Sequence, residues 1–518
     1  MKQTVSLLMG LLIFSCLSQA QRSSKSHAAL LRGPYLQVAT STSIVIRWRT
    51  DVLERGYVYY GTDPGMLNRS VQDTILTSEH KIRLQGLTPH TKYYYAIGSW
   101  KDTLPATANN YFYTLPIPGE EGTYRIAALG DCGNNSINQR NVRDQLVHYL
   151  GNNYLDAWIL LGDNSYSSGR DAEFQSNFFN IYKDDLLPKY PLFPSPGNHD
   201  YYDGDSAEGK VQVTHQIAYF QNFSMPIDGE AGGAASHNPA FYSFDIGNIH
   251  FLSLDSYGIE EGRYQLCDTA GPQVEWVKKD MEANQNKGWI IAYWHHPPYT
   301  MGSHNSDKSA DLVKIRENFI RILERYGVDL VLCGHSHDYE RSRLMKDHFG
   351  PQDSFDPKLN LVNVSSGFYD GTPNSCPYIK DSATGYKGTL YVVSGSAGQL
   401  GGNQSAYPHK ALPYSDYTHG GSGLLEVQGN RLDWKWINAD GRIRDHFTMM
   451  KNAGRRSVLT LKKGESTTLR ASFVGDYQWS DGKTAREITV SPSSTTTYIV
   501  KDKFNCIKDI FEVKVVNP

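Results

Sequence analysis

The sequence predicts an α/β protein whose central part combines β-sheets with helices and whose two ends are all-β modules. Three observations carry this prediction: an all-β pattern before residue 116, apolar strands alternating with amphipathic helices from residue 123 to about residue 450, and a Ser/Thr-rich β pattern from about residue 455. With 518 residues, the chain is too long for one ordinary domain. Its 39% hydrophobic and 20% charged residues are typical of a globular protein.

Residues 29–115 are expected to form the first module. Ser43–Thr50 alternates apolar with more polar residues, as a half-buried strand does, and Lys92–Ser99 is a second strand. The turn and tyrosines that lead into this second strand resemble the tyrosine corner of a fibronectin-III-like sandwich. Pro116–Gly122 is rich in proline, glycine and charge, and it is expected to be the linker that ends the module.

Residues 123–450 are expected to form the central domain. The runs YRIAALG and DAWILLG predict buried strands, and between them Val142, Leu146 and Tyr149 recur at helical spacing. A second helix is predicted in SADLVKIRENFIRILERYG, where the apolar residues share one face and Gly327 ends the helix as a C-cap. The strand VDLVLCG follows at once, so the pattern indicates a layered α/β core. Near its end, GLLEVQGNRLDWKWINADGRI predicts paired antiparallel strands.

Residues 455–518 contain short alternating strands with many serines and threonines. This segment resembles the small immunoglobulin-like modules that follow the main domain of secreted bacterial proteins. It contains no residue pattern that suggests catalysis.

Residues 1–20 are predicted to be a secretory signal peptide that takes no part in the fold. Lys2 precedes an apolar stretch too short to span a bilayer, and Ala20 ends a small-x-small pattern. Cys16 leaves a second interpretation open, in which the protein is tethered by a lipid. No other stretch is long and apolar enough to span a membrane. We therefore expect an exported protein, either secreted or held in the periplasm or at the cell surface, without a transmembrane segment.

The formal net charge of −3 comes without long runs of one sign, so nothing in the charge pattern favours nucleic acid as a partner. Five cysteines remain after the leader, an odd number that does not suggest a disulfide framework. Cys132 and Cys333 end apolar runs and are expected to be buried thiols. Cys267 and Cys376 are candidates for a pair, and Cys506 is expected to be unpaired.

Five short motifs in the central domain share one pattern, in which a predicted strand ends and metal-binding side chains follow. Strands of an α/β sheet end at a common edge, so side chains just beyond their carboxyl ends converge on one crevice. The glycines in these motifs allow the backbone to turn sharply there. The candidate residues are Asp131 in GDCG, Asp163 and Tyr166 in GDNSY, Asn198, His199 and Asp200 in GNHD, His295 and His296 in WHHPP, and His335 and His337 in GHSH.

Each motif also has an ordinary structural interpretation. An aspartate after a strand is most often a cap or a turn former, and a histidine in a proline-stiffened loop is often a core residue. Two histidines separated by one residue, such as His335 and His337, rarely serve packing. Five such motifs, each at a strand end, would be a large coincidence, so the sequence favours a metal site.

In this order the motifs resemble those of the metallophosphoesterase superfamily, which have the forms DxG, GDxxY, GNH(D/E), HxP and GHxH. The tyrosine of GDNSY and the β-module in front resemble the purple acid phosphatases within that superfamily. The resemblance covers roughly Ala29 to Met450. It implies a sandwich of mixed β-sheets flanked by helices for the central domain.

The resemblance also implies two adjacent metal ions, Fe(III) and a divalent Zn, Fe or Mn ion. The first ion would be held by Asp131, Asp163, Tyr166 and His337, and the second by Asp163, Asn198, His295 and His335, with Asp163 as the bridge. The chemistry of the two sets agrees with this division. A phenol has a pKa of about 10, so only a strongly acidic cation keeps it deprotonated, whereas imidazole mixed with carboxylate and amide oxygens suits a divalent ion.

Four further residues receive roles from the same resemblance. His199 would protonate the leaving alkoxide, and Asp200 would orient His199. His296 is expected beside the ligands or facing the substrate. His304 is either a substrate contact or an exposed loop residue.

Three of the seven ligands keep an alternative. Tyr166 would otherwise pack against a loop, which would leave a site with two metals but without the ferric ion. Asn198 would otherwise be a turn residue with a positive φ angle. His296 would otherwise take the place of His295, although the HxP spacing favours His295.

These observations predict an exported phosphatase with two metals that hydrolyses phosphate monoesters by attack of metal-bound hydroxide, as acid phosphatases do. A phosphodiesterase or nucleotidase on the same metals is the nearer alternative. A surface protein that binds without catalysis is the more distant one. A small phosphate ester is the expected partner, and the sequence leaves the natural substrate and the oligomeric state open.

Overall fold

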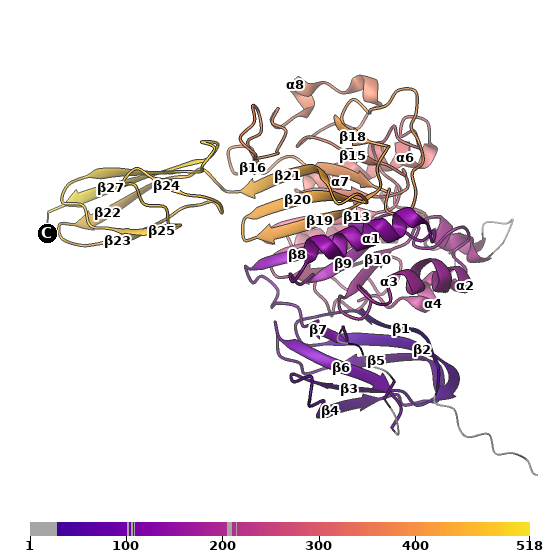
Figure 1. Ribbon diagram of the computed structural model, residues 1–518. Coiled ribbons are helices and arrows are strands. Elements are labelled where there is room, and N and C mark those ends of the chain that lie inside the picture. The colour runs from indigo at the N-terminus through magenta and orange to yellow at the C-terminus, as the bar shows by residue number, and fades with distance from the viewer. Residues whose placement is uncertain are drawn as a thin grey trace, which may run out of the picture.

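The structure is a computed structural model, and it describes residues 28–100, 103–104, 107, 109–204, 210–213 and 215–517. The predicted signal peptide and Cys16 lie outside these residues. Figure 1 shows three parts: a β-module at the amino-terminal end, a central body, and a carboxyl-terminal β-module that projects to one side. Within the described ranges, no helix combines the length and apolar character that a membrane crossing requires.

The amino-terminal module consists of two groups of paired strands. Strands β1, β2 and β5 pair in antiparallel fashion, and β4, β3, β6 and β7 form the second sheet in that order. The strands are β1 (Leu30–Gln37), β2 (Ile44–Glu54), β3 (Tyr57–Gly61), β4 (Arg69–Gln72), β5 (Thr77–Leu84), β6 (Lys92–Gly98) and β7 (Tyr111–Tyr113). The predicted β-rich module is therefore confirmed, whereas its fibronectin-III-like character stays a prediction.

This module is fused to the central domain by more than the linker. Gln37 of β1 pairs in parallel with Leu192 of β10, so β1, β2 and β5 extend the first central sheet. The Arg47 guanidinium of β2 donates to the Gln221 carbonyl at 2.6 Å. The half-buried strand predicted at Ser43–Thr50 is consequently buried on both faces over Ile44–Trp48, because the central domain covers the side that was expected to face water.

The central domain contains two mixed sheets. Parallel neighbours β8, β9 and β10 lie inside the first sheet, and parallel neighbours β12, β13, β14 and β17 lie inside the second. The first sheet has the order β16 (Tyr378–Lys380), β21 (Ile443–Lys451), β20 (Arg431–Asn438), β19 (Gly421–Gln428), β8 (Thr123–Leu129), β9 (Ala157–Leu161), β10 (Leu192–Ser195), β1, β2 and β5. The second has the order β11 (Tyr242–Ile246), β12 (Ile249–Ser253), β13 (Trp289–Trp294), β14 (Leu330–Cys333), β17 (Leu390–Ser394), β15 (Tyr339–Arg341) and β18 (Tyr414–Asp416).

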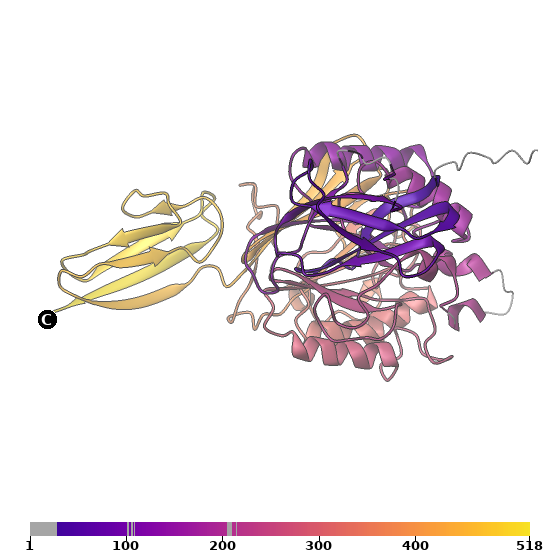
Figure 2. The ribbon, with the colours of Figure 1, turned by 90° about the horizontal axis from the view of Figure 1, so that it is seen from below.

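Helices cover the two sheets from opposite sides, as Figure 2 shows for α1 and for α5 to α7. The helices are α1 (Ile137–Leu150), α2 (Asp171–Glu173), α3 (Asn180–Tyr182), α4 (Ala218–Asn222), α5 (Pro272–Ala283), α6 (Ala310–Lys314), α7 (Ile320–Arg325) and α8 (Pro357–Asn360). The predicted helix before Gly327 is α6 and α7 joined by a π-turn, and Gly327 ends it with φ +74°. In α1, Val142 and Leu146 are buried as predicted. Tyr149 is 37% exposed, because the buried face continues from Leu146 to Leu150 and not to Tyr149.

The alternation of side chains along β13 shows how the layers are held together. Trp289, Ile291 and Tyr293 point into the core between the two sheets, whereas Ile290, Ala292 and Trp294 point into the core under the helices. Across the first core, the rings of Phe193 and Phe244 stack with their centroids 3.9 Å apart. The predicted sandwich of mixed sheets flanked by helices is thus confirmed.

The carboxyl-terminal module is a β-structure with its own small core. It contains a sheet of β22 (Arg456–Lys462), β27 (Lys508–Val516), β26 (Thr496–Lys501) and β24 (Gln478–Trp479), and a pair of β23 (Thr467–Arg470) and β25 (Glu487–Val490). Its immunoglobulin-like character stays a prediction, as do the domain boundaries.

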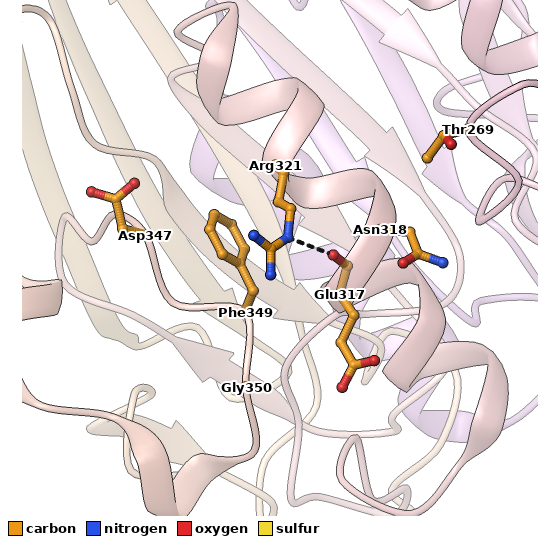
Figure 3. A pocket seen from close by; sticks show the side chains of 7 residues that line it. All are labelled: Thr269, Glu317, Asn318, Arg321, Asp347, Phe349 and Gly350. Atoms are coloured by element: carbon orange, nitrogen blue, oxygen red, sulfur yellow. Dashed lines mark hydrogen bonds between the residues drawn. The ribbon is translucent and has the colours of Figure 1, made fainter.

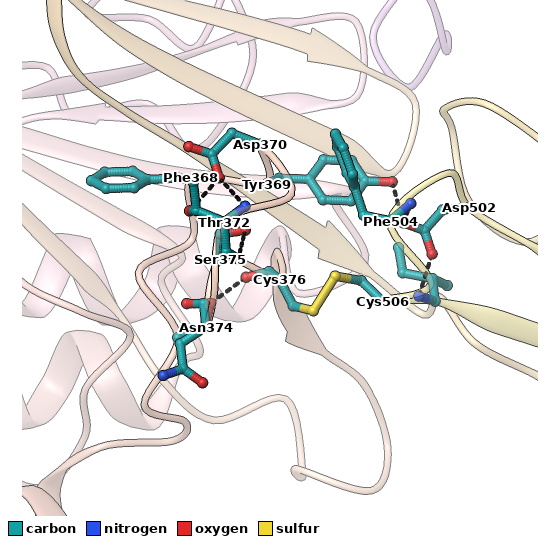
Figure 4. The surroundings of a disulfide bond; sticks show 12 residues. Phe368, Tyr369, Asp370, Thr372, Asn374, Ser375, Cys376, Asp502, Phe504 and Cys506 are labelled. Carbon is teal, nitrogen blue, oxygen red and sulfur yellow. Dashed lines mark hydrogen bonds between the residues drawn. A yellow bond between two sulfur atoms is a disulfide. The ribbon is translucent and has the colours of Figure 1, made fainter.

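A disulfide between Cys376 and Cys506 ties this module to a loop of the central domain (Figure 4). Beside it, the Tyr369 hydroxyl donates to Asp502 at 3.1 Å, and the Tyr369 ring packs edge-on against Phe504. The predicted pair of Cys267 with Cys376 and the unpaired state of Cys506 are therefore wrong.

The error arises because the fold brings together Cys376 and Cys506, which are 130 positions apart in the sequence. Cys267 is instead a buried free thiol. Cys132 and Cys333 are also buried free thiols, as predicted.

Candidate metal centre

The predicted ligands lie at the carboxyl ends of strands from both central sheets. Asp131, Asp163 and Asn198 follow β8, β9 and β10 of the first sheet, whereas His295 and His335 follow β13 and β14 of the second. Because these strands end on the same side of the sandwich, the loops meet in one buried place. Asp131, Asp163 and His295 offer ligand atoms that all lie within 4.8 Å of one another.

The backbone at these ligands is unusual. Asp131, Asp163 and His335 have φ angles of 56°, 51° and 67°, in the left-handed region that residues other than glycine seldom occupy. Neighbouring glycines make the close approach possible. A Cβ atom on Gly197 would stand 2.2 Å from Asp163 Oδ1, and a Cβ atom on Gly334 would stand 2.5 Å from Asp131 Oδ2.

The first donor set gathers around the hydroxyl of Tyr166. That oxygen is 3.0 Å from Asp131 Oδ1, 3.1 Å from Asp163 Oδ2 and 3.1 Å from His337 Nε2. A phenol donates only one hydrogen bond, so its proton cannot satisfy both of the carboxylate oxygens beside it. Tyr166 therefore does not merely pack against a loop.

The second donor set gathers around His295 Nε2. This nitrogen is 3.1 Å from Asn198 Oδ1, 3.2 Å from His335 Nδ1 and 3.3 Å from Asp163 Oδ2. The other ring nitrogen, Nδ1, lies 2.9 Å from the Leu161 carbonyl and donates to it, which aims Nε2 at the donor set. His295 thus lies among the predicted ligands.

Asp163 Oδ2 belongs to both sets, since it contacts the Tyr166 hydroxyl and His295 Nε2. Around a cation with bonds of about 2.1 Å, neighbouring ligand atoms stand about 3.0–3.4 Å apart, which is the spacing found here. The donor chemistry and the spacing therefore fit a pair of cations that share one carboxylate. We call the two sets together the metal cage, which consists of Asp131, Asp163, Tyr166, Asn198, His295, His335 and His337.

The pKa shifts in the cage follow from burial and from the neighbouring charges. Burial, with the carboxylates of Asp131 and Asp163, raises the pKa of Tyr166 well above its ordinary value, so only a nearby cation would favour the phenolate. Burial and the neighbouring His296 lower the pKa of His335 well below 6.5, which keeps this imidazole in the neutral form that binds metals. Burial lowers the pKa of His295, but Asp163 outweighs it and raises the value to about 9. A cation at the second set would displace that proton.

His199 lies at the edge of the cage, and its side chain is 30% exposed. Its Nδ1 donates to the Ser167 carbonyl at 2.6 Å, and its Nε2 stands 3.9 Å from Asp163 Oδ2. The orienting role predicted for Asp200 is therefore wrong, because the Ser167 carbonyl holds the ring.

Asp200 is fully buried and does something else. Its carboxylate accepts from the backbone N–H of Gly197 at 2.8 Å and from the backbone and side-chain N–H groups of Asn164. These bonds join the loop that carries Asp163 to the loop that carries Asn198, so Asp200 positions two ligands of the cage.

His296 and His304 both contact His335. The ring centroids of His296 and His335 are 4.2 Å apart, and His304 stacks on the His335 ring with a centroid distance of 3.8 Å. His296 is buried and bonds through Nδ1 to the Ser256 hydroxyl at 2.9 Å. His304 is partly buried, which excludes the alternative of an exposed loop residue. His295, His296 and His335 also form a group compact enough to hold one cation, an alternative to the pair.

Sequence reasoning missed the residues that orient the ligands. Gln399 contacts His337 Nδ1 at 3.3 Å, and the Ser303 hydroxyl accepts from the His337 backbone N–H at 3.0 Å. The Tyr202 hydroxyl accepts from Asn198 Nδ2 at 3.1 Å. Of these, only Tyr202 had a signal in the sequence, because it lies two residues after GNHD.

A surface hollow of about 770 Å³ lies elsewhere, beside the helix that contains Arg321 (Figure 3). Arg321 there donates to the Glu317 carbonyl of its own helix and packs over the Phe349 ring. None of the residues that line it belongs to the cage. The hollow is therefore not part of the candidate centre.

Two family models match this chain. The model of calcineurin-like phosphoesterases matches residues 124–339, and the model of the purple acid phosphatase N-terminal domain matches residues 32–114. The first range contains all seven residues of the cage. The second falls within the amino-terminal β-module.

Similar proteins carry related names. Purple acid phosphatase 15 of Arabidopsis thaliana is 30% identical over 290 residues, which is 51% of this chain and 49% of that protein. Purple acid phosphatase 23 of the same plant is 28% identical over 289 residues, 51% of this chain and 57% of that protein. The aligned part of the chain thus spans about half the length of these curated relatives.

The structure is similar to that of purple acid phosphatase PPD1 from yellow lupin, Lupinus luteus, with a TM-score of 0.62. The alignment covers 81% of this chain and 74% of the lupin chain at 17% identity. At this identity the likeness supports the fold alone.

We predict that Asp163→Asn abolishes metal loading at both donor sets. The substitution keeps the size of the side chain but removes the charge that the two sets share, so metal analysis should fall from about two ions per chain to below one. The matched control is Asp144→Asn on the exposed side of α1, which should keep the full content. Full loading of Asp163→Asn, with an unchanged circular dichroism spectrum, would contradict the bridging role.

Proposed function

We propose that this chain, a purple acid phosphatase-like protein of the metallophosphoesterase superfamily, is a metal-dependent hydrolase of phosphate monoesters. One observation carries the proposal: two donor sets that share Asp163 Oδ2 meet in a single buried cage. A pair of cations that share one carboxylate is an arrangement with which enzymes clamp a transferring phosphoryl group.

Each donor set has its own proposed occupant. The set around the Tyr166 phenol would hold Fe(III), and the set around His295 would hold a divalent Zn, Fe or Mn ion. When bound, the two cations would neutralise charge on the phosphate oxygens and make a nearby water more acidic.

His199 is proposed to supply the proton that the leaving alkoxide needs. Because Nδ1 donates to the Ser167 carbonyl, Nε2 is the nitrogen that takes up and releases a proton. Nε2 lies on the side of Asp163, and the side chain is open enough to reach a bound ester. General acid catalysis of this kind contributes about 10²–10⁴-fold to a rate.

His296 and His304 are proposed to face the phosphate. His296 uses Nδ1 for Ser256, so its Nε2 remains for the substrate side, and its burial excludes water from that wall of the site. His304 stacks on His335 and would add a donor when the ester is bound.

We also propose that the protein is exported and that its two β-modules are fibronectin-III-like and immunoglobulin-like. The disulfide between Cys376 and Cys506 supports export, since such bonds persist in oxidising compartments. A purely binding protein is less well supported, because binding alone would not require all seven cage side chains to lie at ligand spacing.

We predict that the metal-loaded protein hydrolyses p-nitrophenyl phosphate with a higher kcat/KM than bis(p-nitrophenyl) phosphate. Two cations neutralise the two negative charges of a monoester, whereas a diester has one charge and a second bulky group to accommodate. Steady-state kinetics on both esters decides. A preference for the diester would replace the proposed phosphatase by a phosphodiesterase, and hydrolysis of neither by the loaded protein would favour a binding protein.

We predict that His199→Gln affects esters according to their leaving group. An alkyl phosphate needs a proton on its alkoxide, so its kcat should fall about 10²–10⁴-fold, whereas p-nitrophenolate leaves without a proton and its kcat should fall much less. Gln has about the size of the imidazole but no group that releases a proton to the alkoxide, so it serves as a conservative replacement. An equal loss on both esters, at unchanged metal content, would refute the role of His199 as acid.

A further inference from the structure

A second, larger hollow of about 1280 Å³ lies at the edge of the second central sheet that is opposite to the cage. It is lined by Gly288, Gly327 and Gly388, which precede β13, β14 and β17. These strands are parallel neighbours, so their amino-terminal ends share one edge, whereas the ligands His295 and His335 follow the carboxyl-terminal ends of β13 and β14. At about 3.3 Å per residue, the length of β13 alone keeps the two places about 20 Å apart.

The lining of this hollow is strongly basic. Seven of the lining residues are lysine or arginine and three are aspartate or glutamate, although the whole chain has a net charge of −3. We call it the basic hollow, after the cationic side chains of Arg321, Arg325, Lys346, Lys387, Lys451 and Arg455 that line it.

Most of these cations have no carboxylate of their own. Two of the seven are paired, Lys287 with Asp245 at 2.5 Å and Lys451 with Asp329 at 2.7 Å. Among the residues that the structure describes, the other five have no carboxylate oxygen within 4.0 Å of a charged nitrogen. Their charges are therefore available to a ligand.

Lys451 also has a charge that its carboxylate partner does not balance. Asp329 is fully buried and is bonded to the Lys380 ammonium as well, at 2.6 Å, so two ammonium groups share one carboxylate. Lys380 is itself buried, whereas Lys451 lines the hollow with 15% of its side chain exposed. A buried charge is costly unless an opposite charge accompanies it. An anion in the hollow would supply that charge beside Lys451.

Glu324 reduces this excess of positive charge only in part. It lines the hollow and interacts electrostatically with Lys380. Burial raises the pKa of Glu324 to about 7, so near neutral pH this carboxylate is only partly ionised. The other two acidic residues of the lining, Glu121 and Asp347, are exposed and face the five unpaired cations.

The unpaired cations come from several parts of the chain. Two lie on α7, one in the loop after β15, one in the loop before β17 and one directly before β22 of the carboxyl-terminal module. Figure 3 shows Arg321 over the Phe349 ring, and these two residues line the basic hollow as well as the smaller one. A single phosphate ion is too small to contact cations on all these elements, whereas an anion with several charged groups is not.

The side chains of the lining indicate the kind of anion. Arginine binds tetrahedral oxyanions through paired N–H groups, and lysine adds a compact positive charge. Phosphate and sulfate groups have this geometry in common. The ligand that matches the lining is therefore a molecule on which several such groups lie close together.

We infer that the basic hollow is a second binding site, for an oligoanion with several phosphate or sulfate groups, such as a short polyphosphate or a sulfated sugar. The inference goes beyond the proposed function, because none of the residues that line the hollow belongs to the cage. It predicts binding without hydrolysis at a place remote from the metals.

The test measures the binding of sucrose octasulfate to the metal-loaded protein by isothermal titration calorimetry at low ionic strength. This probe contains no phosphate ester, so turnover at the cage does not disturb the measurement. We expect saturable binding of about one molecule per chain, which weakens as sodium chloride is added because salt screens the attraction.

Tripolyphosphate is the second probe, and it is measured on the Asp163→Asn variant, because the cage of that variant is predicted to lack the metals that this chelator would extract. Binding of both probes supports the shared oxyanion chemistry. Binding of sucrose octasulfate alone assigns the site to sulfated sugars, and binding of tripolyphosphate alone assigns it to polyphosphates.

A pair of charge reversals locates the binding. Arg325→Glu combined with Lys346→Glu changes two unpaired cations of the hollow, so the dissociation constant for the bound probe should rise about tenfold or more. The kcat on p-nitrophenyl phosphate should stay unchanged, which also shows that the variant is folded. The matched control is Lys183→Glu combined with Lys463→Glu, which makes the same change in net charge at two exposed lysines outside the hollow.

Binding of neither probe would overturn the site while leaving the proposed phosphatase intact. Equal affinity in the Arg325→Glu, Lys346→Glu variant would do the same. An equal loss of affinity in the control pair would also overturn it, because the attraction would then come from the net charge of the chain and not from the hollow.

Discussion

The arrangement of this protein depends on one buried carboxylate oxygen, Asp163 Oδ2, which lies within 3.1 Å of the Tyr166 hydroxyl and 3.3 Å of His295 Nε2. These two contacts come from opposite sheets of the central sandwich. A carboxylate in this position is costly in a dry interior unless positive charge accompanies it. The packing of the two sheets, the glycines in the loops and the left-handed backbone at three ligands all serve to bring donor atoms to this one oxygen.

Buried polar residues hold the loops and strands that carry the ligands of the cage. Asp200 joins the loops after β9 and β10. Asp445 of β21 receives a bidentate pair of bonds from the Arg341 guanidinium and a third from the Tyr339 hydroxyl. That anchor fixes β15, the strand that directly follows the loop with His335 and His337. Substitution of Asp445 would leave the buried Arg341 guanidinium without its carboxylate partner, and breaking a buried ion pair in this way is strongly destabilising.

Much of the site could be predicted because strand ends converge by the geometry of a sheet, so residues after several apolar runs are neighbours whatever the loops do. Asp131, Asp163 and His295 were found by this rule. The role of Asp200 could not be found, since the order of residues in GNHD does not say which side chain turns inward. His199 turned outward and Asp200 inward, so a backbone carbonyl took the orienting role. The disulfide and the fusion of β1 to β10 depend on how separate modules dock, and local sequence patterns do not contain that information.

The most direct test of the shared carboxylate is an anomalous-diffraction map from a crystal of the metal-loaded protein. The account predicts two metal peaks, each at about 2.0–2.2 Å from an oxygen of the Asp163 carboxylate, with Tyr166 beside one peak and Asn198 beside the other. A single peak held by His295, His296 and His335, away from Asp163, would contradict it.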